Sequence, residues 1–405
     1  MALTANPAAV VPSLPLRSAI LLTALNAVPP LAIDMFLPSM PAMADEFDVR
    51  PGILQLAVTL FLLALAMSQL VYGPMSDRFG RRPVLIAGLS LFIGGGLGCM
   101  VAPNAEILIA ARVVQGIGGG AGPALGRAIV LDVYGRQRAA QFLAQMTIAI
   151  ALAPMIAPVI GSGLQALGWR TVFVVLTAIG VAMLAGYLWL FKETIPAKDE
   201  TAMNGRQMAR NYGTLLSSRT FTSYALVMAL MFSAQLIFIS SSSFVLIDEL
   251  GLSPGLFGLS FGSVALGIML GATISRRLVQ QMAEARVTWI GTIVSAVATA
   301  LMAAVTLAGV ESVFIIVLPM FVSAAGMGIL RPPATAASLI PFPQMAGLAS
   351  AVQGFSQIAF ASLYSIVYGG VIGVGVVSMV LAIAFAANTG LLTLALLRPG
   401  REARA

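Results

Sequence analysis

Histidine is absent from this 405-residue sequence, and cysteine occurs only once, as Cys99. Without histidine the chain lacks the commonest metal ligand and the usual acid–base catalyst near neutral pH. A single cysteine excludes an internal disulfide framework. Charged residues are also scarce, at 9% of the chain against about 25% in an ordinary soluble domain. These shortages argue against a soluble enzyme, and we expect neither a metal site nor a cofactor.

Hydrophobic residues, by contrast, make up 59% of the chain, more than a soluble protein could hide from water. The formal net charge of +7 could suggest a nucleic-acid partner. The arginines, however, fall in short gaps between apolar runs, and no basic and aromatic platform accompanies them. We therefore expect membrane lipid, rather than nucleic acid, to surround the protein.

Apolar runs of membrane-spanning length recur along the whole sequence. A spanning helix needs about 20 mostly apolar residues. The first run exceeds signal-peptide length and has no basic leader before it, so we interpret it as a retained helix. Proline and glycine lie inside several runs, which membrane helices tolerate. The runs predict twelve spans, near residues 18–40, 53–74, 83–102, 105–126, 140–164, 169–191, 221–245, 255–275, 288–308, 312–332, 347–370 and 372–397.

The longest polar stretch lies between the sixth and seventh spans and divides the chain into halves. We predict an all-α membrane protein with an N-terminal six-helix bundle (1–191), a cytoplasmic linker (192–219) and a C-terminal six-helix bundle (220–405). Arg17 precedes the first span as Arg219 precedes the seventh, an offset of about 200 residues. Repeated halves are common in secondary transporters, which hold their substrate between them near the bilayer midplane.

The distribution of arginine between the spans predicts the orientation of the chain. Arginines concentrate after even-numbered spans, whereas the gaps after odd-numbered spans are acidic or nearly uncharged. Loops rich in Lys and Arg remain in the cytoplasm. We therefore expect a multi-pass protein of a plasma membrane with both termini in the cytoplasm.

The most specific motif, GPMSDRFGRRP at residues 73–83, joins the second and third spans. Its glycines permit a tight turn and close packing, and Pro83 suits the first turn of the next helix. The Asp77 carboxylate can pair with nearby arginines or face a positive helix N-terminus. A positively charged anchor with a turn would explain the basic residues, but not the complete pattern. We assign a conformational latch to Asp77, Arg78, Gly80, Arg81 and Arg82.

With this loop, the sequence resembles the major facilitator superfamily, and further motifs are similar to its Bcr/CflA group of bicyclomycin and chloramphenicol exporters. The resemblance covers nearly the whole chain. It implies the twelve-helix fold of that superfamily and a drug:proton antiporter. The motifs that carry the narrower resemblance are AIDMFLP at 32–38, RVVQG at 112–116, GWR at 168–170, KET at 192–194 and PFPQMAG at 341–347.

The sequence departs from this group in two places. Its fifth span carries Ala153–Pro154 where the antiporter motif has Gly-Pro, which leaves open how this helix bends. Arg331 stands where the group more often has an uncharged residue. Arg331 either alters substrate choice or snorkels to the cytoplasmic surface, and the sequence favours snorkelling.

Two charges, Asp34 and Arg112, lie well inside predicted spans. Such charges cost about 2.5–3.5 kcal/mol on insertion scales and are usually functional. The first and fourth spans run in opposite directions, so the two charges reach a similar depth. We predict that Asp34 carries the coupling proton and that Arg112 tunes it. The alternative is a structural ion pair that merely permits insertion.

Polar side chains recur at helical spacing on several spans, which predicts a cavity for amphiphilic ligands. The alternative for any one of these residues is a hydrogen bond between helices. The candidate cavity residues are Asn26, Gln115, Gln235, Gln353, Gln357 and Tyr364.

Other classes of function find little support. An intramembrane enzyme would need clustered catalytic groups, and ATP-driven transport would need a phosphate-binding Gly-x-x-x-x-Gly-Lys-Ser/Thr loop; neither pattern occurs. A receptor would not need two repeated six-helix halves. We expect a monomer that exports small amphiphilic or antibiotic-like compounds in exchange for protons. The alternative is an exporter or facilitator of a native small metabolite.

Overall fold

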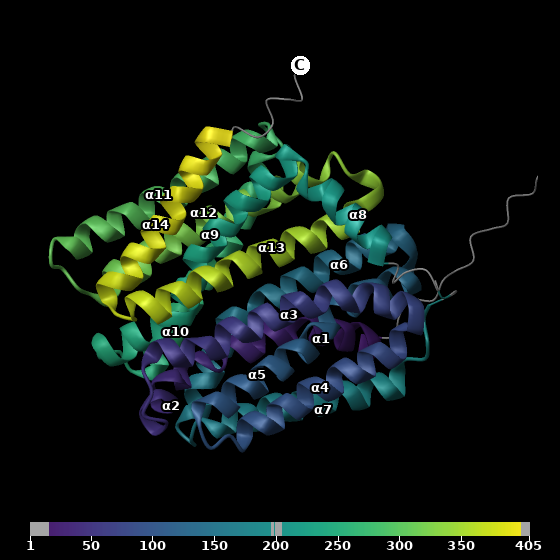
Figure 1. Cartoon of the computed structure of the whole chain (residues 1–405), viewed down its shortest axis with the longest axis horizontal. Helices are drawn as coiled ribbons and strands as arrows, with labels where there is room; N and C mark the ends of the chain where they lie inside the picture. The colour runs from purple at the N-terminus through teal and green to yellow at the C-terminus, as the bar shows by residue number, and fades with distance from the viewer. Residues whose placement is uncertain (1–15, 196–197, 199–204, 398–405) are drawn as a thin grey trace, which may run out of the picture.

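The computed structural model describes residues 16–195, 198 and 205–397, and all regular structure in these residues is helical (Figure 1). Helices of the N-terminal half lie together on one side of the molecule, and those of the C-terminal half lie on the other. The N-terminal half contains α1 (Leu16–Asp34), η1 (Leu37–Ser39), α2 (Met40–Glu46), α3 (Pro51–Phe79), α4 (Arg81–Met100), α5 (Ala105–Gly119), α6 (Ala121–Gln165) and α7 (Arg170–Leu190).

The C-terminal half follows a linker that itself contains a helix, α8 (Gly205–Leu216). This helix was not predicted from the sequence, because the linker is polar and has no apolar run of spanning length. The half comprises α9 (Arg219–Ser243), η2 (Phe244–Glu249), α10 (Pro254–Leu278), α11 (Glu284–Leu307), α12 (Val313–Leu339), η3 (Pro343–Met345), α13 (Ala346–Val367), η4 (Tyr368–Ile372) and α14 (Val376–Leu397).

Within the described residues, ten helices are long and apolar enough to cross a membrane. The remaining crossings lie in α5 and α6. Gly122 of α6 lies against the Leu25 carbonyl, and Gly161 of the same helix lies against that of Met35. The two contact points, Leu25 and Met35, are ten residues apart, which corresponds to a helical rise of only about 15 Å. A straight helix from Gly122 to Gly161 would instead separate these two glycines by about 58 Å.

The α6 helix must therefore double back, and its two arms run in opposite directions. The first arm continues α5 after Gly120, whose backbone remains in the right-handed helical region. The second arm carries the apolar segment Leu152–Gln165. Together with the ten long helices, these two arms give the twelve crossings expected from the sequence.

The two halves repeat the same helix packing. In the N-terminal half, Gly118 lies against the backbone of α4 at Gly88 and Phe92. In the C-terminal half, Gly326 lies against the backbone of α11 at Gly291 and Ser295. Small residues at such crossings let membrane helices approach closely. In lipid the hydrophobic effect does not drive helices together, so close van der Waals packing stabilises their association instead. The first arm of α6, with α5, thus corresponds to α12.

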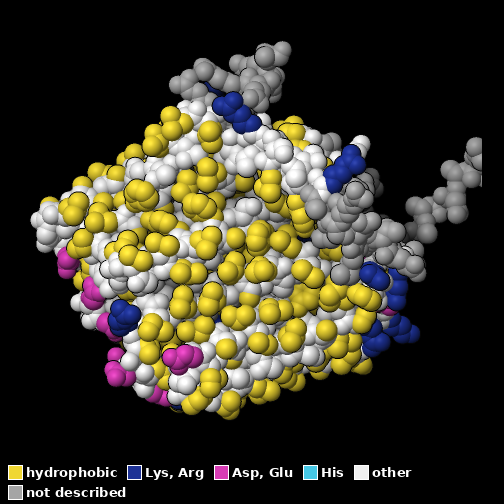
Figure 2. Space-filling view, viewed as in Figure 1, with side chains coloured by type: hydrophobic (Ala, Val, Ile, Leu, Met, Phe, Trp, Pro, Cys, Tyr) yellow, Lys and Arg dark blue, Asp and Glu magenta, His cyan; other side chains and the backbone are white. Residues whose placement is uncertain are grey.

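The surface consists of an apolar belt between two charged ends. Figure 2 shows a broad face of yellow and white atoms, with Asp and Glu gathered at its left edge and Lys and Arg at its right edge and top. The acidic end includes Glu46, which accepts hydrogen bonds from Trp169 Nε1 at 2.6 Å and Arg170 Nη1 at 2.7 Å. This pair of bonds ties α2 to the start of α7 and accounts for the Gly-Trp-Arg motif.

Side-chain hydrogen bonds join the two halves toward the acidic end. Gln55 Nε2 of α3 donates to Ser241 Oγ of α9 at 2.5 Å. Thr59 Oγ1 of α3 lies 3.2 Å from Ser365 Oγ of α13, and Ser162 Oγ of α6 donates to the Pro254 carbonyl at 2.7 Å. These residues are buried or half-buried, so the halves are closed against each other at this end.

Candidate functional site

Arg112 lies on α5 in the interior of the N-terminal half, with 0% of its surface exposed. Its Nε donates to the Ala57 carbonyl at 3.2 Å, and its Nη1 donates to the Ala32 carbonyl at 3.1 Å and to Gln115 Oε1 at 2.8 Å. Arg112 thereby connects α1, α3 and α5 through hydrogen bonds. A buried guanidinium needs such acceptors, because desolvation without them is expensive.

Aromatic rings complete the surroundings of this guanidinium. Its central carbon lies 4.0 Å from the ring centroid of Phe61 and 4.8 Å from that of Phe36. Both rings are themselves fully buried. The negative face of an aromatic ring attracts a cation, most strongly where water is excluded. Carbonyls and rings together hold the positive charge of Arg112 without a carboxylate.

Asp34 is the last residue of α1 and is 5% exposed. No described residue forms a hydrogen bond or an ion pair with its carboxylate, and Arg112 bonds to Ala32 instead, two residues earlier. The ion pair considered from the sequence is therefore not formed in this conformation. A buried carboxylate without a partner costs less when it carries a proton. The position suits a group that exchanges protons between states, and that role stays a prediction.

The predicted cavity residues of the N-terminal half lie within that half. The Asn26 amide donates to the Leu22 carbonyl of its own helix at 2.9 Å and lies beside Gly126 of α6. The Gln115 side chain packs toward Gly96 of α4, and its Nε2 is buried without a hydrogen-bond partner. Gln115 thus supports Arg112 through its Oε1 atom, and the part of Asn26 and Gln115 in a substrate cavity stays a prediction.

The predicted residues of the C-terminal half are also well packed. Gln353 Nε2 donates to Ser338 Oγ at 2.9 Å and contacts the Met228 sulfur at 3.2 Å, so it joins α13 to α12 and α9. The Tyr364 hydroxyl donates to the Ala382 carbonyl of α14 at 2.7 Å, which is the interhelical alternative considered above. Gln357 and Gln235 are buried, and the Nε2 of Gln235 has no partner. Their role in binding stays a prediction.

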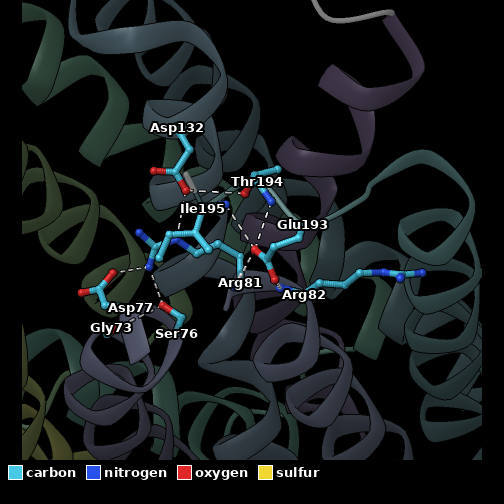
Figure 3. A network of polar contacts seen from close by, with 9 residues as sticks. All are labelled: Gly73, Ser76, Asp77, Arg81, Arg82, Asp132, Glu193, Thr194 and Ile195. Atoms are coloured by element: carbon cyan, nitrogen blue, oxygen red, sulfur yellow. Dashed lines mark hydrogen bonds and ion pairs between the residues drawn. The ribbon is translucent and has the colours of Figure 1, made fainter. Parts of the chain in front are cut away.

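At the basic end, Arg81 organises the predicted latch loop (Figure 3). Its Nη1 donates to Asp77 Oδ1 at 2.5 Å and to Ser76 Oγ at 2.6 Å, and its Nε donates to Asp132 Oδ2 at 3.0 Å. Arg81 begins α4, Asp77 lies in the last turn of α3 and Asp132 lies on the first arm of α6. One guanidinium therefore ties three helices together, and its planar fork suits such multiple recognition.

Glu193, just after α7, caps the start of α4. Its carboxylate accepts hydrogen bonds from the backbone N–H of Arg81 at 2.9 Å and of Arg82 at 3.2 Å. Partial burial opposes ionisation, but the N–H groups of Ile195, Arg82, Arg81 and Thr194 together lower the pKa of Glu193. A carboxylate at a helix N-terminus is also favoured by the helix dipole.

Gly80, between α3 and α4, explains why this turn needs glycine. Its φ of 109° is a conformation that other residues rarely adopt, and a Cβ atom there would collide with the Glu193 carboxylate. The other basic residues are less engaged: Arg78 lies over the neighbouring Phe79 ring at 5.4 Å, and the Arg82 side chain points away from the cluster in Figure 3. Gly80 and Arg81 therefore determine the geometry of the turn between α3 and α4.

Sequence reasoning missed Asp132 and Glu193 as members of this network. Both follow even-numbered spans, and so belong to the same end of the molecule as Arg81. Their predicted position at the same end as Arg81 was the sequence feature that could have identified them as its partners. Of the two kinds of partner considered from the sequence, the Asp77 carboxylate has an arginine, Arg81, in this structure, and it makes no bond to the N-terminus of α13 within the described residues. The latch stays a prediction for another conformation.

Residues 22–367 match the family described as the Major Facilitator Superfamily, which is most of the chain. The chain belongs to this superfamily. Its members and the relatives below are membrane transporters rather than enzymes.

Three proteins illustrate what this superfamily member is similar to. It is 32% identical over 357 residues to the Bacillus subtilis (strain 168) protein described as the uncharacterized MFS-type transporter YdgK, covering 87% of this chain and 89% of that one. It is 29% identical over 378 residues to the multidrug resistance protein MdtL of Escherichia coli O45:K1, covering 93% and 94%. A crystal structure of a D-xylose-proton symporter shares the fold, with a TM-score of 0.73, 15% identity and coverage of 93% and 97%.

Proposed function

We propose that this transporter is a proton-coupled antiporter of the Bcr/CflA type, which exports small amphiphilic or antibiotic-like compounds across the bacterial inner membrane. The observation that carries this proposal is the similarity to a multidrug resistance protein over 93% of the chain. The positive-inside distribution supports an orientation in which the basic end and both termini face the cytoplasm. The acidic end, where the halves are closed, then faces outward.

In this proposal the structure corresponds to an inward-facing state with a protonated Asp34. Arg112 is bound to carbonyls and Gln115, as expected if the Asp34 carboxylate does not claim its charge. Loss of the proton to the cytoplasm restores a negative charge near Arg112. Arg112 bound to carbonyls then favours the inward-facing state, and Arg112 beside a charged Asp34 favours the outward-facing state. The proton can shift this equilibrium because it binds the two states with different affinity.

The test is transport by the purified protein in proteoliposomes with an imposed pH gradient, using a chemically diverse panel of antibiotics and dyes. We expect uphill movement of several compounds against the direction of proton flow. A gradient of 100 mV supplies about 2.3 kcal/mol per proton, enough for a substantial concentration ratio. Gradient-independent movement of one native metabolite would instead identify a facilitator, and the absence of any uphill transport would refute proton-coupled export.

A further inference from the structure

Arg331 lies on the inward face of α12, where a cation is unexpected. The lipid-facing stripe of this helix is marked by Phe314, Leu318 and Val322, which are 81%, 64% and 37% exposed. At about 100° per residue, the Arg331 side chain leaves the helix about 140° from the centre of that stripe. Arg331 therefore does not lie on the lipid face, where the sequence interpretation of snorkelling would place it.

The neighbours of Arg331 show what this inward face meets. Thr335, one turn along α12, has its hydroxyl 3.9 Å from the Met228 sulfur of α9. Ser338, two turns along, accepts the Gln353 amide of α13. Arg331 lies between these contacts and the buried Met327, yet Arg331 itself is exposed. Water therefore reaches the interior side of α12 at Arg331.

The guanidinium of Arg331 has no partner within the described part of the chain. No hydrogen bond or ion pair joins it to another described side chain, although its own carbonyl accepts from Thr335 at 2.8 Å. Arg81 and Arg170, in contrast, each have a carboxylate within 3.0 Å. A cation inside a membrane protein without a counter-charge marks a pathway or a ligand site more often than a structural element.

A second exposed arginine lies on the corresponding helix of the other half. Gly118 and Gly326 are equivalent in the two halves, and Arg127 follows Gly118 by nine residues where Arg331 follows Gly326 by five. The two arginines are thus about one helical turn apart in the repeat. Arg127 donates its Nε to the Pro123 carbonyl at 2.9 Å and has no carboxylate within ion-pair distance among described residues.

From these observations we propose that Arg331 binds an anionic group, a carboxylate, on amphiphilic substrates that enter from the basic end. The inference rests on the proposed export function and names the substrate class of that same site. The apolar part of the substrate then lies against Met228 and Met327, whose flexible thioethers adapt to different shapes. Arg127 adds positive charge on the opposite half, which attracts anions into the space between the halves.

The experiment measures equilibrium binding to the purified protein in nanodiscs of zwitterionic phosphatidylcholine at pH 7. The probes are radiolabelled aromatic monocarboxylates, each beside its uncharged primary amide, with 1-naphthaleneacetate and 1-naphthaleneacetamide as the first pair. We expect the carboxylates to bind at least about tenfold more tightly, since charge-assisted hydrogen bonds are the strong ones. Arg331→Gln should abolish this preference and leave amide binding unchanged, and Arg331→Lys should retain part of it.

Arg277→Gln serves as the matched control, because Arg277 is exposed at the basic end of α10 and outside the proposed site. This variant should keep the full preference. Equal binding of both members of each pair, binding of neither, or an unchanged preference in Arg331→Gln would overturn the inference. If the wild-type preference holds but proteoliposomes show no uphill transport, the substrate class stands and the proposed export function fails.

Discussion

The Nη1 atom of Arg112 donates to the carbonyl of Ala32 at 3.1 Å, and this bond places the guanidinium beside the end of α1 without engaging Asp34. The cation is stabilised by the Ala57 carbonyl and the faces of Phe36 and Phe61. The carboxylate of Asp34 is buried nearby in the same half. The Arg112 guanidinium and the Asp34 carboxyl group thus both lie in the interior without bonding to each other in this conformation.

Asp34→Asn should abolish uphill, proton-driven export while retaining exchange of substrate across the membrane. Asparagine is close to the shape of a protonated carboxyl but cannot release a proton, so the cycle loses its coupling step. The measurement is accumulation in proteoliposomes with a pH gradient, beside substrate exchange without one. Glu106→Gln is the control, because Glu106 is an exposed acid at the start of α5. Unchanged pH-driven accumulation in Asp34→Asn would place the proton site elsewhere.

Arg112→Lys should not restore the function lost in Arg112→Ala. Lysine offers a compact charge without the planar fork, so it cannot reach Ala32, Ala57 and Gln115 together. Each buried acceptor left without a donor costs about 1–3 kcal/mol. We expect both variants to unfold at lower temperature and to show altered pH dependence of transport. Wild-type pH dependence in Arg112→Lys would show that charge alone suffices.

Asp77→Asn should slow transport while leaving expression and membrane insertion intact. In this structure Asp77 pairs with Arg81, and 43% of its side chain is exposed. It is therefore available to face the N-terminus of α13 when the basic ends of the halves approach. Such a contact contributes about 0.3–1 kcal/mol, which alters the balance between states more than the stability of either half. Normal turnover per unit of inserted protein would contradict the latch.

Glu193→Gln should lower the free energy of unfolding by about 0.3–1 kcal/mol at neutral pH, because the cap of α4 loses its charge. The folded state lowers the pKa of Glu193, so its stabilising effect is present above the unfolded pKa of about 4.3 and is lost as pH falls through the lower folded value. The difference in thermal stability between variant and wild type should therefore shrink toward acid pH. Glu311→Gln, at an exposed position beyond α11, is the control. A pH-independent difference would argue for steric rather than electrostatic capping.

Ser241→Ala should weaken the closure between the halves at the acidic end. The change leaves Gln55 Nε2 without its acceptor, at a cost of about 1–3 kcal/mol to the closed arrangement. Hydrogen–deuterium exchange should rise in residues 51–62 and 358–369, which face each other there. Ser295→Ala is the matched control, since it removes the 2.7 Å contact with Ser323 inside one half. A similar rise in the control would indicate general loosening.

The sequence by itself determined the twelve crossings, the two halves and the charged loop between the second and third spans. Apolar length, repeated arginines and the pattern around Gly80 are local properties, because membrane helices satisfy their backbone hydrogen bonds within each segment. Asp34 and Arg112 could likewise be singled out, since a charge inside an apolar run is visible without knowing its neighbours.

The tertiary structure alone decided which partners these residues have. The carbonyls of Ala32 and Ala57, the rings that flank Arg112 and the capping of α4 by Glu193 join residues far apart in the chain. Similarly, the sequence could place Arg331 in a span but not on its inward face. The direction of a side chain depends on how α12 packs against α9 and α13, and that packing is a property of the assembled helices rather than of any one of them.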